Sequence, residues 1–226
     1  MIAYAKQKGV IDSYINTNAA LLTKDVALRL ILAGIDRISI SFEGTTKEVY
    51  EKYRVGAKFE TVVDNIKDFV KLRDDLGFDK PRVRIQTVAL PELKPHLENY
   101  KEFWGDIADE VAFIDFKDYS QRRRQLIHNW ACPYLWQRLM VRWDGTISAC
   151  QFDYSNELKL GNVNDGDSIR DVWKSTFIEK LRTLAKTGKL HTIELCDGCG
   201  FRTTEIMKLK DAKTDDNVPS EDTEKN

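Results

Sequence analysis

The sequence predicts an α/β fold built on a parallel sheet, followed by a small α+β domain. Three observations lead to this prediction: strand and helix patterns alternate up to about residue 118, a hairpin signal then replaces that alternation, and all four cysteines lie in the later part. Strands that alternate with helices form parallel β/α units joined by right-handed crossovers. The functional residues of such a sheet gather at the C-terminal ends of its strands.

In the first region, period-2 alternation and β-branched residues indicate the strands, and one-sided apolar patterns indicate the helices. Thr23 is suited to begin a helix and Gly34 to end it. Gly77 and Pro81 end the longest helix. The expected strands are residues 11–16, 36–42, 82–90 and 110–116, and the expected helices are 24–33, 59–76 and 94–104.

In the second region, two short strands flank Asp144-Gly145, a dipeptide typical of a tight hairpin turn. Ser168 is suited to cap a helix that runs to about Lys186. The last stretch is polar, acidic and free of aromatic residues, which is typical of a disordered tail. We therefore expect domains at 1–119 and 120–210, and a disordered tail at 211–226.

Composition excludes several classes of protein. The 226 residues carry a formal net charge of −1, so no field of one sign favours nucleic acid as a partner. The first nine residues lack the apolar core of a secretory signal, and no run of about 18 apolar residues predicts a membrane span. We expect a cytoplasmic protein, in which thiols stay reduced and cysteines are candidate metal ligands.

The four cysteines form a constellation typical of a metal centre. Cys196 and Cys199 make a CxxC knuckle, with Gly198 expected to relax the turn between them. Cys132 and Cys150 lie on either side of the hairpin, which can bring them together. Four thiolates suit a 4Fe-4S cluster or a tetrahedral zinc ion. The remaining alternative is four small buried hydrophobic residues.

The cysteine region resembles the SPASM domains of radical S-adenosylmethionine (SAM) enzymes. In such a domain a cysteine is followed by a spacer, a glycine and a second cysteine five residues later, the spacing of Gly145 and Cys150. The similarity continues through Leu160-Gly161-Asn162-Val163 and Val172-Trp173 to the closing CxxC knuckle. The resemblance implies one auxiliary 4Fe-4S cluster bound by Cys132, Cys150, Cys196 and Cys199.

The first region resembles the barrel of the same enzymes. Asn16-Thr17-Asn18 is similar to a strand-end Thr-Asn-Gly motif, with Ala19 in place of the glycine. Residues 39–44 are similar to a fourth-strand Ser-Leu-Asp-Gly motif, and Tyr50 and Arg54 resemble the tyrosine and arginine that follow it. The resemblance implies a partial (β/α) TIM-like barrel of the radical SAM type that lacks its first units.

The resemblance also implies site residues at the C-terminal ends of the strands. Asn18, Ser41 and Arg54 are the expected SAM contacts, because Ser41 ends a strand and the planar guanidinium of Arg54 suits the SAM carboxylate. Glu43 and Gln86 are weaker candidates for contact with substrate. Such enzymes hold their catalytic cluster with CxxxCxxC, whereas the first cysteine of this sequence is Cys132. We therefore expect a fragment that is inactive alone.

In function, the resemblance implies SAM-dependent radical modification of a peptide, a sugar or another small molecule. It also implies an electron donor such as flavodoxin or ferredoxin. The alternative is a non-catalytic four-cysteine module in which zinc or an iron–sulfur cluster stabilises a binding surface.

Overall fold

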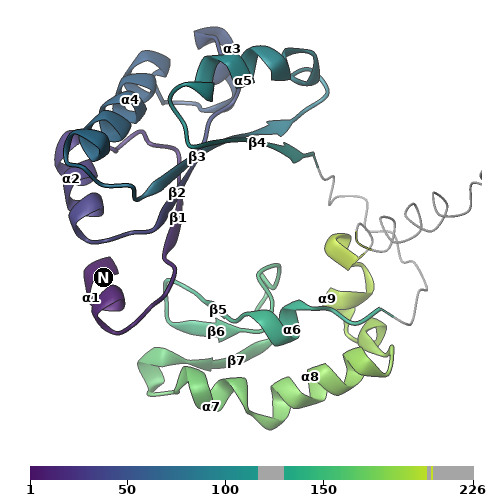
Figure 1. Cartoon of the computed structure of the whole chain (residues 1–226). Helices are drawn as coiled ribbons and strands as arrows, with labels where there is room; N and C mark the ends of the chain where they lie inside the picture. Colours follow the sequence, from purple (N-terminus) through teal and green to yellow (C-terminus); the bar gives the residue numbers. More distant parts are fainter. Residues whose placement is uncertain (117–129, 203–204, 206–226) are drawn as a thin grey trace, which may run out of the picture. The chain divides into compact units, whose positions relative to one another are not determined.

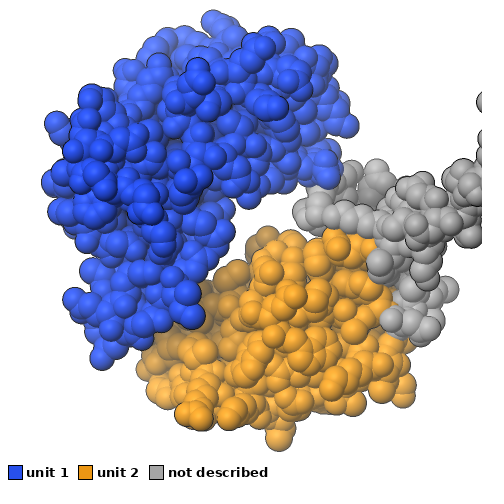
Figure 2. Space-filling model, viewed as in Figure 1, with its two compact units in different colours: residues 1–117 blue, residues 118–226 orange. Residues whose placement is uncertain are grey.

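The chain folds as two compact units, residues 1–117 and 118–226 (Figure 2). The structure is a computed structural model, and it describes residues 1–116, 130–202 and 205. The predicted boundary near residue 120 and the predicted tail at 211–226 lie outside the described residues. Each unit is described by itself below.

Unit 1 contains a sheet of four parallel strands in the order β1-β2-β3-β4. Because consecutive strands are neighbours and the crossovers have one hand, the connecting helices fall on the same face of the sheet. Helices α2, α4 and α5 cover that face (Figure 1). This singly wound order is that of a barrel segment. The strands are β1 (Tyr14–Thr17), β2 (Arg37–Ser41), β3 (Arg82–Ala89) and β4 (Glu110–Asp115).

The helices of unit 1 begin mostly where the sequence predicts. The Thr23 side chain accepts a hydrogen bond from the Val26 N–H and begins α2. The predicted helix at 94–104 opens instead with a 3-10 turn, which contains Pro95. The helices are α1 (Ile2–Gln7), α2 (Lys24–Leu32), α3 (Lys47–Tyr53), α4 (Phe59–Asp75), η1 (Lys94–His96) and α5 (Leu97–Gly105).

The core of unit 1 lies between the sheet and these helices. Ile38 and Ile40 of β2 and Val83 and Ile85 of β3 are fully buried in it. Trp104 of α5 is also fully buried. Alternate residues of the same strands point to the opposite face, which is where the polar side chains of the candidate site lie.

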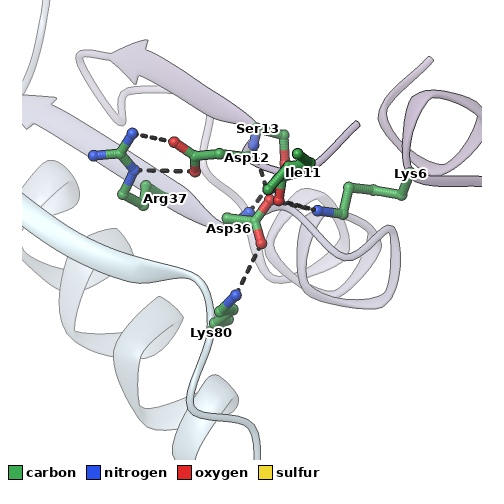
Figure 3. Close-up of polar contacts among 7 residues, drawn as sticks. All are labelled: Lys6, Ile11, Asp12, Ser13, Asp36, Arg37 and Lys80. Carbon is green, nitrogen blue, oxygen red and sulfur yellow. Dashed lines mark hydrogen bonds and ion pairs between the residues drawn. The ribbon is translucent and has the colours of Figure 1, made fainter. Parts of the chain in front are cut away.

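A buried carboxylate ties together the N-terminal ends of the strands. Asp36, 6% exposed, accepts hydrogen bonds from the backbone and the hydroxyl of Ser13 at 2.8 and 2.9 Å (Figure 3). Lys6 of α1 lies 2.6 Å from one carboxylate oxygen, and Lys80 lies 3.0 Å from the other. These bonds, chiefly that of Lys6, hold the pKa of Asp36 well below its usual range. They also explain why β1 begins at Tyr14, three residues later than predicted.

The stability of unit 1 is therefore expected to fall in acid. A pKa lowered by folding means that Asp36 stabilises unit 1 at pH values above its unfolded pKa of about 3.9, and that this contribution is lost as the pH falls below it. Asp36→Asn should be less stable than the parent at pH 7 and should lose less stability between pH 7 and pH 3. The measurement is urea denaturation followed at the indole NMR signal of Trp104.

A matched control is Asp75→Asn, which removes an exposed carboxylate paired with Lys71 on α4. Exposed pairs contribute little to stability. Its stability should follow the parent at both pH values. Equal acid sensitivity of the parent and Asp36→Asn would contradict this account of Asp36.

Unit 2 is built on a small antiparallel sheet with helices packed beside it. Its strands run in the order β5-β6-β7. Ser168 caps a helix as predicted, and helical structure ends at Lys186 as predicted, but the single helix expected between them is wrong, because Ser175 caps a second helix there. The elements are α6 (Tyr134–Gln137), β5 (Met140–Val141), β6 (Thr146–Ser148), β7 (Lys159–Asn162), η2 (Val163–Asp165), α7 (Ile169–Trp173), α8 (Thr176–Lys186), η3 (Leu190–Thr192) and α9 (Glu194–Asp197).

Within the described ranges, each helix is too short or too polar to cross a lipid bilayer.

Candidate functional site

The C-terminal ends of β1 and β2 carry polar side chains with unused donors. Ser41 is the last residue of β2 and lies opposite Gln86 in the register of β3. Asn18 directly follows β1. In the described part of the chain, the Ser41 hydroxyl and the Asn18 side-chain N–H₂ make no hydrogen bond, so both can donate to a ligand. This fits a cofactor that carries carboxylate and hydroxyl oxygens.

The loop after β1 has a fixed conformation. The Asn18 side-chain oxygen accepts a hydrogen bond from the Ala20 N–H at 3.1 Å, and the Thr17 hydroxyl accepts one from the Ala19 N–H at 3.1 Å. Ala19 has a φ of 57°, in the left-handed region that favours glycine. A glycine, which the resemblance implies at this position, would adopt the same conformation without strain.

Arg54 forms an ion pair that the sequence did not reveal. Its Nε and Nη2 atoms both donate to the carboxylate of Glu43, the second of these bonds at 2.7 Å. Glu43 is 7% exposed, and its carboxylate raises the pKa of Arg54. A guanidinium has five N–H donors, so three remain for a ligand after this pairing. Glu43 therefore orients Arg54.

The four cysteines come from separate elements and line one cavity. Cys132 precedes α6, Cys150 follows β6, Cys196 lies in α9, and Cys199 follows that helix. The hairpin that separates the first two depends on Gly145, which has a φ of 82°. The backbone N–H of Cys199 donates to the Cys196 carbonyl at 3.4 Å and forms the knuckle. The structure thus brings all four predicted ligands to one cavity.

The volume of this cavity can be compared with the space inside a zinc site. Its volume is about 40 Å³, more than the 10–15 Å³ or so that one water needs. Zinc binds thiolates at about 2.3 Å, so four sulfurs around it lie about 3.8 Å apart and leave no such space. Among the described residues, no three His, Cys, Asp or Glu side chains converge on a single ion. The cavity as a whole is therefore larger than the space inside a single four-coordinate zinc site.

The thiols lie in an apolar environment. Burial raises the pKa of Cys132 to about 11 and that of Cys196 to about 12, and repulsion among the neighbouring thiolates adds to both shifts. Burial also raises the pKa of Cys150. Without a metal the buried thiols are neutral, and binding of a metal centre releases their protons.

Aromatic side chains form part of the cavity wall. Trp130, Tyr134 and Phe152 line it. Phe201, which sequence reasoning missed, stacks on Tyr134 at a centroid distance of 4.4 Å and closes another side. Trp143, in contrast, is 98% exposed and lies outside this wall.

Two charged residues beside the cavity were also missed. Asp153 is fully buried next to the Cys150 loop, and Arg202 lines the cavity and is 4% exposed. The only sequence signal for either was its closeness to a cysteine, since burial of a charged residue has no sequence pattern.

Comparison with known families agrees with this division of the chain. Residues 1–102 match the Radical SAM superfamily, and residues 132–200 match SPASM, an iron–sulfur cluster-binding domain. The four cysteines of the cavity all fall inside the second match.

Curated relatives cover most of the chain. A probable GTP 3′,8-cyclase of Saccharolobus islandicus is 38% identical over 74% of this chain and 67% of the relative. The tungsten-containing aldehyde ferredoxin oxidoreductase cofactor-modifying protein of Pyrococcus furiosus is 22% identical over 97% of this chain and 74% of the relative.

Two solved structures of BtrN show a weaker likeness. The open conformation aligns with a TM-score of 0.43 at 16% identity, over 88% of this chain and 76% of that one. The complex with AdoMet and 2-DOIA aligns with a TM-score of 0.49 at 15% identity, over 87% and 63%.

The two family matches also give the cofactors, which are SAM for the first unit and a 4Fe-4S cluster for the SPASM domain. The chain belongs to the radical SAM superfamily and carries a SPASM iron–sulfur cluster-binding domain.

Proposed function

We propose that this chain supplies the SAM-binding strands and the auxiliary-cluster domain of an enzyme that modifies a small molecule or a peptide by radical chemistry. The observation that carries the proposal is that Cys132, Cys150, Cys196 and Cys199 line the same apolar cavity. These four residues are the proposed ligands of the auxiliary cluster. The names of the relatives, a GTP cyclase and a cofactor-modifying protein, favour a small molecule or a cofactor as substrate.

In this family, SAM supplies a 5′-deoxyadenosyl radical that abstracts hydrogen from the substrate. The residues of this chain bind and orient. Ser41 and Asn18 donate to SAM from the strand ends, and Arg54, oriented by Glu43, pairs with its carboxylate. The electron donor is a small carrier such as flavodoxin or ferredoxin, in the cytoplasm.

All four cysteines of this sequence are proposed ligands of the auxiliary cluster, so none remains for a CxxxCxxC motif. We therefore propose that the chain cleaves SAM only when a segment with that motif is supplied. The experiment is to reconstitute the chain anaerobically, add SAM and dithionite, and assay 5′-deoxyadenosine.

The proposal expects a brown protein with about four irons per chain, as a 4Fe-4S cluster requires. It expects no 5′-deoxyadenosine until the CxxxCxxC segment is added. A colourless chain with stoichiometric zinc would favour the non-catalytic module instead. Product above the iron-free control from the chain alone would contradict the proposed need for a second segment.

The SAM contacts make a separate prediction for the chain joined to a CxxxCxxC segment. Loss of a charge-assisted hydrogen bond costs about 1.5–3 kcal/mol, so Arg54→Ala should weaken SAM binding by roughly 10- to 150-fold. Ser41→Ala should weaken it less, because a neutral hydroxyl makes a weaker bond. The measurement is equilibrium binding of SAM.

The matched control is Arg29→Ala, which removes an exposed arginine from α2. It should bind SAM like the parent. Glu43→Gln should weaken binding by less than Arg54→Ala, since it loosens the guanidinium and leaves its charge in place. Parent-like affinity in both Ser41→Ala and Arg54→Ala would show that the strand-end assignment is wrong.

A further inference from the structure

Two buried charges of opposite sign lie beside the cysteine cavity. Asp153 is fully buried and Arg202 is 4% exposed. A charge removed from water is costly unless its surroundings compensate for it. The positions of these two residues therefore call for a physical explanation.

Asp153 has the hydrogen-bonding pattern of an ionised carboxylate. Its Oδ1 accepts from the Glu157 N–H at 2.8 Å. Its Oδ2 accepts from the Leu158 N–H at 2.9 Å and from the Ser148 hydroxyl at 2.8 Å. Three donors point at two oxygens, which is the arrangement that a negative charge favours. Within the described residues, no lysine or arginine pairs with Asp153.

This carboxylate is coupled to the proposed ligand Cys150. The Asp153 N–H donates to the Cys150 carbonyl at 3.3 Å. The Ser148 hydroxyl, which donates to Asp153, also accepts from the Cys150 N–H at 3.3 Å. The Phe152 N–H points at the Cys150 sulfur at 3.4 Å. Burial raises the pKa of Cys150, and the negative charge of Asp153 acts in the same direction.

Arg202 is a buried positive charge beside a different proposed ligand, Cys196. Arg202 lines the cavity together with all four cysteines, and its Nη1 lies 3.5 Å from the Cys196 carbonyl oxygen. Arginine stays protonated in proteins. Its charge opposes the rise that burial causes in the pKa of Cys196. The negative charge of Asp153 therefore acts on Cys150 and the positive charge of Arg202 acts on Cys196, two proposed ligands that line the same cavity.

We propose that Asp153 and Arg202 set the reduction potential of the auxiliary cluster in opposite directions, Asp153 lowering it and Arg202 raising it. The inference rests on the proposed function of the four cysteines as cluster ligands. The potential of such a cluster depends on nearby charge and on hydrogen bonds to its sulfurs. Reduction adds one electron and no bond, so a buried negative charge disfavours it and a buried positive charge favours it.

The test is a redox titration of the reconstituted full chain with dithionite and mediators, followed by electron paramagnetic resonance. Asp153→Asn should shift the midpoint potential to more positive values. Arg202→Gln should shift it to more negative values, and Arg202→Lys should stay closer to the parent. The double variant Asp153→Asn/Arg202→Gln should lie between the two single variants.

Glu157→Gln is the matched control for Asp153, because it removes an exposed carboxylate four residues away and keeps the backbone donor. Solvent screens an exposed charge, so its potential should equal that of the parent. If Asp153→Asn fails to hold the cluster, Ser148→Ala takes its place. That variant removes one donor and leaves the carboxylate, so its potential should become more negative.

A purely structural role for the two residues would change cluster retention without shifts of opposite sign. Full iron content with unmoved potentials, or shifts of the same sign in Asp153→Asn and Arg202→Gln, would contradict the inference alone. A parent chain that takes up no iron would contradict the proposed function and this inference with it.

Discussion

Alanine at any one of the four cysteines is expected to abolish the cluster and to destabilise unit 2 far more than unit 1. The four thiolates line one cavity, and three of them pack against the core of unit 2. Binding of a metal centre supplies folding free energy to small cysteine-rich domains, so loss of one ligand removes much of that stabilisation. Iron content should fall from about four per chain to less than one, which iron and sulfide analysis after anaerobic reconstitution measures.

The loss of stability in the cysteine variants is expected in unit 2 and not in unit 1. Unit 1, followed at the Trp104 signal, should unfold at the same urea concentration in the parent and in each cysteine variant. Trp143→Ala is the matched control within unit 2, because that side chain is 98% exposed on the neighbouring hairpin. It should keep its iron. A cysteine variant with full iron and an unchanged visible spectrum would remove that cysteine from the ligand set.

The parallel sheet could be predicted because its strands have strong local patterns. β2 and β3 alternate buried branched residues with polar ones, and they lie within one residue of the predicted limits. The short helix α3 and the short strand β7 have too few residues to show a period. The break between α7 and α8 depends on one capping side chain, Ser175, inside a pattern that otherwise continues.

In the candidate site, the sequence could predict only those residues whose type and spacing themselves indicate a chemical role. The cysteines were found from type and spacing, and the structure brings them to one cavity. The Glu43–Arg54 pair could not be found, because it depends on how two loops fold together. The role expected for Gly198 is wrong, since its φ of −96° is open to any residue.

A last prediction concerns the turn that ends β2. Gly44 has a φ of 71°, and a Cβ there would lie 2.3 Å from Val49 Cγ1 and 2.8 Å from Val49 Cβ. The left-handed conformation costs a non-glycine residue about 1–2 kcal/mol, and overpacking costs about 1–3 kcal/mol more. Gly44→Ala should therefore destabilise unit 1 by about 2–5 kcal/mol, measured by urea denaturation at the Trp104 signal.

Gly56→Ala separates the two causes. Gly56 has a φ of 86°, but nothing lies within 4 Å of a Cβ built on it, so only the conformational cost of about 1–2 kcal/mol applies. Because the Gly44 turn directly follows Glu43, relief of the clash with Val49 moves the carboxylate that orients Arg54. Gly44→Ala should therefore also weaken SAM binding in the chain joined to a CxxxCxxC segment, whereas Gly56→Ala should not. Equal destabilisation by the two substitutions would mean that the turn at Gly44 accommodates the added Cβ at no extra cost. Close packing against Val49 would then not fix the end of β2.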